Sequence, residues 1–201
     1  MTTFLLIRHA SHDLLGNTIA GRSPGVSLND RGRGEAQRLT ERLAQTAIAA
    51  IYTSPRDRSR ETAAPLAARL GVEARINSAI DEIEFGEWTG QTFEGLKDDF
   101  EWQVWCENRT MAQPPQGEPI TRVQRRITRE LERLAALHPD QTVALFTHGD
   151  VIKAALARIL TMSLDELERF EIAPASVSML VQGGDWAQVR LINDTGEFPP
   201  R

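Results

Sequence analysis

The chain has 201 residues, of which 41% are hydrophobic and 25% are charged, and its formal net charge at pH 7 is −5. These values are typical of a folded globular protein rather than a disordered one, and the acidic balance gives no support to a nucleic-acid partner. The single cysteine, Cys106, excludes an intramolecular disulfide and a cysteine-rich metal site, so we expect a cytoplasmic protein. The sequence holds no apolar run long enough to span a bilayer, so we expect no membrane partner.

The first half of the chain is predicted to alternate strands and helices. Asn29 is a good N-cap, Ser54 followed by Pro55 has the signature of an N-cap with proline at the first helical position, and Gly71 is a typical helix end. In chain order we expect a strand over 4–7, a loop through 25, a helix from 29 to about 47, a strand over 50–52, a helix from 54 to 70, a strand over 72–76 and a loop over 82–91.

The second half continues the alternation. We expect a helix from Thr92 to about 108, a connector over 111–118, a helix over 120–137, a strand over 142–146, helices over 150–160 and after Ser163, and a hairpin of strands 176–181 and 186–192. Strands that alternate with helices predict an α/β fold, a three-layer α/β/α arrangement with a mainly parallel central sheet. We expect one domain over 1–201, in which an irregular cap over roughly 86–119 sets specificity.

Several polar residues follow the predicted strands where a site would form. Arg8 and His9 end the first strand, His148 follows the strand over 142–146, and Arg58 lies in the first turn of a helix that follows another strand. Ligands of open parallel sheets bind beyond the carboxyl ends of the strands, arginines match phosphate oxygens, and helix N-termini favour anions. The pattern therefore predicts one pocket for a phosphate ester.

Two histidines can divide the work of phosphoryl transfer. One neutral imidazole can attack phosphorus, while the other, with the arginines, balances charge in the transition state. The leaving alkoxide also needs a proton, and the loop over 82–91 offers Glu82, Glu84 and Glu87. The residues alone leave the choice among these three carboxyl groups open.

Five segments, in order, resemble the motifs of the histidine phosphatase superfamily, which has the phosphoglycerate-mutase-like fold. They are Leu6-Ile7-Arg8-His9-Ala10; Gly21-Arg22 with Leu28-Asn29-Asp30-Arg31-Gly32; Tyr52-Thr53-Ser54-Pro55-Arg56-Asp57-Arg58 with Glu61-Thr62-Ala63; Glu82-Ile83-Glu84-Phe85-Gly86-Glu87-Trp88-Thr89-Gly90; and Thr147-His148-Gly149.

The resemblance implies a role for each matching residue. His9 would accept the phosphoryl group, Arg8, Arg58 and His148 would bind it, and Glu82 would donate the proton and then activate water to hydrolyse phospho-His9. Neither a metal nor an organic cofactor is implied. We also predict substrate contacts for a second set of residues, Arg22, Gly21, Asn17 and Gly149.

The chain departs from the family pattern after the first histidine. Ala10 replaces the usual glycine, Ser11-His12 stands where Glu-Thr or Glu-Ser is usual, and Asn17 lies slightly later than the family's phosphate-binding asparagine. The family's mutases are longer, so the resemblance favours a phosphomonoester hydrolase of small phosphorylated metabolites. A phosphoglycerate-type mutase and a non-catalytic phospho-ligand binding module are the alternatives, and the sequence leaves a homodimer open.

Overall fold

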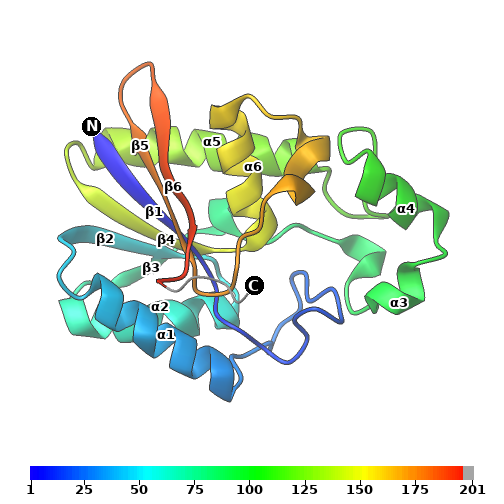
Figure 1. The fold of residues 1–201 in the computed structure, drawn as a ribbon, viewed down its shortest axis with the longest axis horizontal. Helices are drawn as coiled ribbons and strands as arrows, with labels where there is room; N and C mark the ends of the chain where they lie inside the picture. The colour runs from blue at the N-terminus through cyan, green and yellow to red at the C-terminus, as the bar shows by residue number, and fades with distance from the viewer. Residues whose placement is uncertain (197–201) are drawn as a thin grey trace.

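The computed structural model describes residues 1–196, and its centre is a six-stranded sheet in the order β3-β2-β4-β1-β5-β6 (Figure 1). The strands are β1 (Thr2–Arg8), β2 (Ile48–Thr53), β3 (Ala74–Ile76), β4 (Thr142–Thr147), β5 (Val177–Gln182) and β6 (Ala187–Asp194). The first four run parallel, whereas β5 pairs antiparallel with both β1 and β6. The sheet is thus mixed and mainly parallel, as predicted, and β5 and β6 form the expected hairpin.

Helices cover both faces of this sheet, which confirms the predicted three layers. The α-helices are α1 (Asp30–Leu43), α2 (Asp57–Leu70), α3 (Phe93–Leu96), α4 (Phe100–Glu107), α5 (Ile120–Leu137) and α6 (Gly149–Leu160), with 3-10 turns at Ser78–Ile80, Gly86–Trp88 and Leu164–Arg169. In Figure 1, α1 and α2 lie on one side of the sheet, α5 and α6 on the other, and α3 and α4 lie together beyond them. No helix within residues 1–196 is both long enough and apolar enough to cross a membrane.

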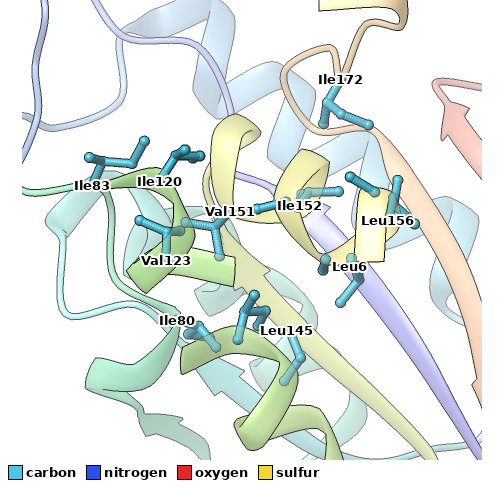
Figure 2. Packing of buried hydrophobic residues seen from close by; sticks show 14 of the residues in the cluster. Leu6, Ile80, Ile83, Ile120, Val123, Leu145, Val151, Ile152, Leu156 and Ile172 are labelled. Atoms are coloured by element: carbon cyan, nitrogen blue, oxygen red, sulfur yellow. The ribbon is translucent and has the colours of Figure 1, made fainter. Parts of the chain in front are cut away.

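The alternation of side chains along β1 divides the core into two. Phe4 and Leu6 belong to the core under α5 and α6, whereas Leu5 and Ile7 belong to the core over α1 and α2. Figure 2 shows the first core, where Leu6 lies among side chains of α6. Burying an aliphatic side chain of this kind contributes roughly 1.5–3 kcal/mol, so both faces hold β1 firmly at the centre.

Three predicted helix boundaries are wrong. The helix expected to reach about 47 ends at Leu43, and the chain turns there to enter β2 at Ile48. Ser54 does not cap α2, which begins at Asp57, because Arg56 is still extended (φ −73°, ψ 139°) and is itself the N-cap residue. The Ser54 hydroxyl accepts from the Arg56 N–H at 3.3 Å and donates to Asp81 Oδ1 at 3.0 Å. The predicted helix over 92–108 is two helices, since Thr92 caps α3 and Asp99 caps α4 by accepting from the Trp102 N–H. The predicted N-cap at Asn29 and helix end at Gly71 are confirmed.

Candidate active site

Residues from three neighbouring parallel strands meet at the carboxyl edge of the sheet. His9 follows β1, His148 follows β4 and Ser54 follows β2. The rings of His9 and His148 have centroids 5.2 Å apart, and both side chains are buried. The parallel register therefore brings together two histidines that are 139 positions apart in the sequence.

A cavity of about 600 Å³ opens beside these histidines. Its lining includes five of the predicted site residues, Arg8, His9, Gly21, Arg58 and Glu82. His148 is fully buried and reaches the cavity through Glu82, whose Oε2 lies 3.3 Å from His148 Nδ1. The loop after β1 forms one wall and is joined to the start of α3 by an isolated bridge between Thr18 and Thr92.

The geometry of His9 leaves one ring nitrogen available for nucleophilic attack. Nδ1 lies 2.9 Å from the carbonyl oxygen of Ala10. Because a carbonyl oxygen can only accept, Nδ1 carries the proton of the neutral ring and Nε2 keeps its lone pair. Burial, together with the charges of Arg58 and Arg8, holds the pKa of His9 well below its ordinary value, so the ring is neutral at pH 7.

Two arginines beside His9 have donors that no described group uses. Arg58 is 1% exposed, and its Nη2 donates to the Gly21 carbonyl oxygen at 2.8 Å, while its Nε and Nη1 are buried without a partner. Arg8 Nη1 donates to the Ile172 carbonyl oxygen at 2.6 Å, and its Nε is likewise buried and unpaired. Unsatisfied buried donors are costly, so a bound anion would satisfy several of them at once.

Glu82 is a largely buried carboxyl group with a perturbed pKa. Its side chain is 14% exposed, and burial raises its pKa to about 7, an effect that the nearby Asp150 reinforces and Arg58 opposes. A substantial fraction is therefore protonated near neutral pH, as a general acid requires. Of the three acids left open above, Glu84 instead contacts Arg22 at 3.3 Å, and Glu87 accepts from Gln116 at 2.9 Å.

The Glu82 backbone is held from several sides. Its N–H donates to Asp81 Oδ1 at 2.8 Å, and its carbonyl oxygen accepts from Arg22 Nε at 2.8 Å and from Arg126 Nη2 at 3.1 Å. The neighbouring Ile83 side chain is fully buried in the core under α5 (Figure 2). These contacts fix the position of a carboxyl group that sits in an otherwise irregular loop.

Sequence reasoning did not predict the hydrogen-bonded chain that runs from His148 through Ser54 to Asp81. His148 Nε2 lies 2.7 Å from Ser54 Oγ, which donates to Asp81 Oδ1 at 3.0 Å. Because Arg58 Nη2, 3.3 Å from His148 Nδ1, can only donate, Nδ1 accepts and Nε2 carries the proton. Ser54 and Asp81 thus position His148. The signal was present, since Ser54 ends its strand as His9 does and Asp81 directly precedes Glu82.

The predicted substrate contacts lie in different places. Gly21 lines the cavity and presents its carbonyl oxygen to Arg58. The described residues that line the cavity do not include Arg22, Asn17 or Gly149. Asn17 is exposed, and Arg22 is bonded to Glu82, Glu84 and Glu118. Gly149 packs against the Arg8 guanidinium, where a Cβ would lie in van der Waals contact at 3.4 Å from Nε.

The comparisons agree with this geometry. The sequence profile of the histidine phosphatase superfamily (branch 1) matches residues 4–195. The chain is 33% identical over 199 residues to the Bifunctional protein Rv2228c of Mycobacterium tuberculosis, covering 97% of this chain but only 54% of that relative. It is 28% identical over 185 residues to Phosphoserine phosphatase 1 of Hydrogenobacter thermophilus, covering 90% and 86%.

The fold also resembles a solved structure. YhfR of Bacillus stearothermophilus superposes with a TM-score of 0.91 at 27% identity, covering 96% of this chain and 98% of that one. Because the family profile spans almost all of the described residues, and the motif residues Arg8, His9, Arg58 and Glu82 line one cavity, this chain belongs to the histidine phosphatase superfamily, branch 1.

Proposed function

We propose that this protein is a metal-independent phosphomonoester hydrolase that acts on small phosphorylated metabolites through a phosphohistidine at His9. The observation that carries the proposal is the set of unpaired, buried guanidinium donors of Arg8 and Arg58 around a neutral imidazole. Similarity to a phosphatase of a small phosphorylated metabolite supports the substrate class.

In the first step, the arginines hold the phosphoryl oxygens and His9 Nε2 attacks phosphorus. An N–P bond forms, the bond between phosphorus and the ester oxygen breaks, and Glu82 gives its proton to the departing oxygen. The ring becomes cationic, and the Ala10 carbonyl that accepts from Nδ1 stabilises that charge. The arginines balance the charge of the equatorial oxygens in the transition state, and the buried His148, which accepts from Arg58, positions that guanidinium.

In the second step, water attacks the same phosphorus atom. The Glu82 carboxylate takes a proton from the water, the N–P bond breaks with its electron pair returning to Nε2, and inorganic phosphate leaves. Glu82 is then protonated again and ready for the next turnover. One carboxyl group therefore acts as acid and then as base, which suits a pKa of about 7.

The arginines of the cavity supply the positive charge that a metal ion supplies in metal-dependent phosphatases. Ligand atoms of His9, Glu82 and His148 lie within 4.8 Å of one another, but Arg58 is 3.8 Å from the Glu82 carboxylate and would repel a metal cation placed there. We expect turnover to be unchanged by EDTA, whereas a loss that zinc or magnesium restores would contradict metal independence.

The decisive test is His9→Ala. This variant should lose hydrolysis of alkyl phosphates and the acid-labile phosphoryl label that the wild-type protein acquires during turnover. Glu87→Gln, outside the cavity, is the matched control. Full activity in His9→Ala would remove the proposal. With 3-phosphoglycerate as substrate, release of phosphate supports a hydrolase, whereas formation of 2-phosphoglycerate would indicate a mutase.

A further inference from the structure

The cavity extends beyond the phosphoryl site into an outer chamber with its own chemistry. We propose that this chamber selects phosphate monoesters whose alcohol part carries an aromatic ring and no anionic group besides the phosphate; the inference rests on the proposed hydrolase function. We call the aromatic side chains that line the chamber, Phe85, Phe93, Trp102 and Trp105, the aromatic wall.

Phe93 and Trp102 are the members of the aromatic wall with surface to receive a ring, since Phe85 and Trp105 are buried at 8% and 1% exposure. Phe93 and Trp102 have ring centroids 6.0 Å apart, and Phe85 meets Trp105 edge-on at 6.2 Å. Phe93 is 41% exposed, so part of its ring is free for contact with a ligand. Aromatic pairs favour these tilted and edge-to-face arrangements, and a planar leaving group can join them.

The volume of the cavity is sufficient for such a substrate. Its 600 Å³ falls within the range of about 300–1,000 Å³ usual for small-molecule sites. A phosphoryl group fills only the part beside His9 and Arg58, so room remains beside the aromatic wall. A short alkyl leaving group would leave that apolar surface in contact with water.

The charges of the outer chamber oppose a second anion. Apart from Arg8 and Arg58, the one cation among the described lining residues is Arg109. It is already paired with Asp150 at 3.1 Å and with Glu168 at 2.7 Å, and its guanidinium lies 5.5 Å from the Trp105 ring centre. Glu171 adds another acid to the same lining. A substrate with an additional carboxylate or phosphate group would place that group near these acids, and no unpaired cation among the described residues of the chamber would offset the repulsion.

The nearby arginines outside the lining do not change this balance. Arg22 contacts Glu84 and Glu118, and Arg56 lies 3.0 Å from Asp81. Both guanidinium groups therefore form ion pairs with acidic residues of the protein itself. Lys153 is paired in the same way, with Glu168 at 3.1 Å. Among the described residues, a substrate such as 3-phosphoglycerate, with a carboxylate near its ester, would find unpaired cationic donors only at the phosphoryl site.

The test compares three esters of primary alcohols: 2-phenylethyl phosphate, propyl phosphate and 3-phosphoglycerate. We expect kcat/KM for the phenylethyl ester to exceed that for each of the others by about tenfold or more, as 1.4 kcal/mol of ring contact or charge repulsion would produce. Trp102→Ala should reduce the preference for phenylethyl over propyl, whereas Trp186→Ala, an exposed tryptophan outside this cavity, should not.

A charge variant tests the second half of the inference. Glu168→Gln removes the carboxylate that Arg109 and Lys153 share, and should raise kcat/KM for 3-phosphoglycerate several-fold relative to propyl phosphate. Glu166→Gln, on the same 3-10 turn but paired with Arg169, is the matched control. Equal kcat/KM for all three esters, or preference for 3-phosphoglycerate, would overturn the inference.

The proposal that the chamber selects a ring can be tested separately from the proposal that the protein is a hydrolase. If no ester is hydrolysed, the proposed function fails, and calorimetric binding of the same esters to His9→Ala still tests the chamber. The phenylethyl ester should then bind most tightly. Binding in that variant with no preference for the ring would contradict the chamber alone.

A second inference rests on a different observation, the side chain of His12. We propose that His12 is a further substrate-binding residue, which donates a hydrogen bond to a phosphoryl oxygen. The residue is 5% exposed and lines the cavity, its ring centroid is 5.2 Å from that of His9, and its Nδ1 is buried without a partner.

The protonation state of His12 fits this role. Burial and the charges of Arg58 and Arg8 lower its pKa to about 4, so at pH 7 the ring is neutral, with one donor and one acceptor nitrogen. Its neighbour Ser11 is committed elsewhere, since its N–H and hydroxyl both donate to Glu35. His12 is therefore the polar side chain that this turn presents to the substrate.

His12→Phe keeps a ring and removes both nitrogens. We expect it to raise KM and the inhibition constant of inorganic phosphate by about tenfold, with kcat changed much less, and His12→Asn to restore part of the loss through its amide N–H. Thermal melting of both variants checks the fold. Unchanged phosphate inhibition in a folded His12→Phe protein would contradict the assignment.

Discussion

Three ionisable residues in or beside the cavity have pKa values displaced in the directions that the proposed phosphoryl transfer needs. His9 and His148 are held neutral by burial and by Arg58, while Glu82 has a pKa near 7. Burial is the largest cause for all three, because it disfavours whichever form is charged. The same burial therefore favours the neutral imidazole and the protonated carboxyl group that the proposed mechanism needs.

The pH dependence of turnover should follow Glu82. Since the acid must be protonated, kcat/KM for an alkyl phosphate should fall as pH rises through about 7, approaching tenfold per pH unit above that value. Glu82→Gln should remove this limb and slow alkyl phosphates far more than p-nitrophenyl phosphate, whose leaving group needs less protonation. Equal losses on both substrates would argue against Glu82 as the acid.

The same shift predicts a pH dependence of stability. The folded-state pKa of about 7 lies above the reference value of 4.5, so the folded protein holds this proton more tightly than the unfolded chain. The resulting stability is fully present below about pH 4.5 and is lost as pH rises through 7. Between pH 5 and 8, the free energy of unfolding should fall by about 2–3 kcal/mol more in wild type than in Glu82→Gln, measured by urea unfolding.

At the scale of elements, the loop that carries Glu82 is locked against the connector before α5. Glu118 N–H donates to the Glu84 carbonyl oxygen at 2.8 Å, and Glu87 N–H donates to the Pro115 carbonyl oxygen at 3.0 Å. Gly86, at φ +51°, lets the two backbones approach so closely that a Cβ would lie 1.9 Å from Pro115 O. The position of the acid thus depends on a glycine outside the cavity lining.

Gly86→Ala should push the two segments apart and move Glu82. We expect kcat/KM for alkyl phosphates to fall at least about tenfold, with a clear drop in melting temperature. Gly90→Ala is the matched control, since its φ is +86° but no atom lies within 4 Å of the added Cβ. That variant carries only the backbone strain of about 1 kcal/mol and should keep its activity. Normal activity in Gly86→Ala would show that the lock does not position the acid.

At the scale of the whole molecule, the position of the site residues depends on the sheet and on the hydrophobic cores that pack against its two faces. Arg8 and His9 extend from a strand with a parallel neighbour on one edge and an antiparallel neighbour on the other. The two helical layers shield that strand from water, so the backbone at its carboxyl end is held in place. This rigidity keeps the histidines at a constant separation.

Leu145→Ala would test how much one core contributes. The side chain is fully buried in the core under α5 and α6, so the truncation should lower the free energy of unfolding by about 2–5 kcal/mol. Leu191→Ala, 38% exposed on β6, should cost far less. Urea unfolding at constant pH measures both losses. Equal losses of unfolding free energy would show that burial of Leu145 in this core does not add to stability.

The sequence by itself determined the layered α/β fold and the residues at the strand ends, because hydrophobic periodicity and helix caps are local signals. Asn29, Gly71 and the neighbourhood of His9 and His148 could be predicted in this way. The tertiary structure alone decided which polar groups pair. Ser54 donates to Asp81 instead of capping a helix. Arg22 is ion-paired with internal acids, and Arg109 is paired with Asp150 and Glu168. Such pairings join residues 27 to 96 positions apart, and they depend on strand order and on the path of the loops, which no local pattern encodes.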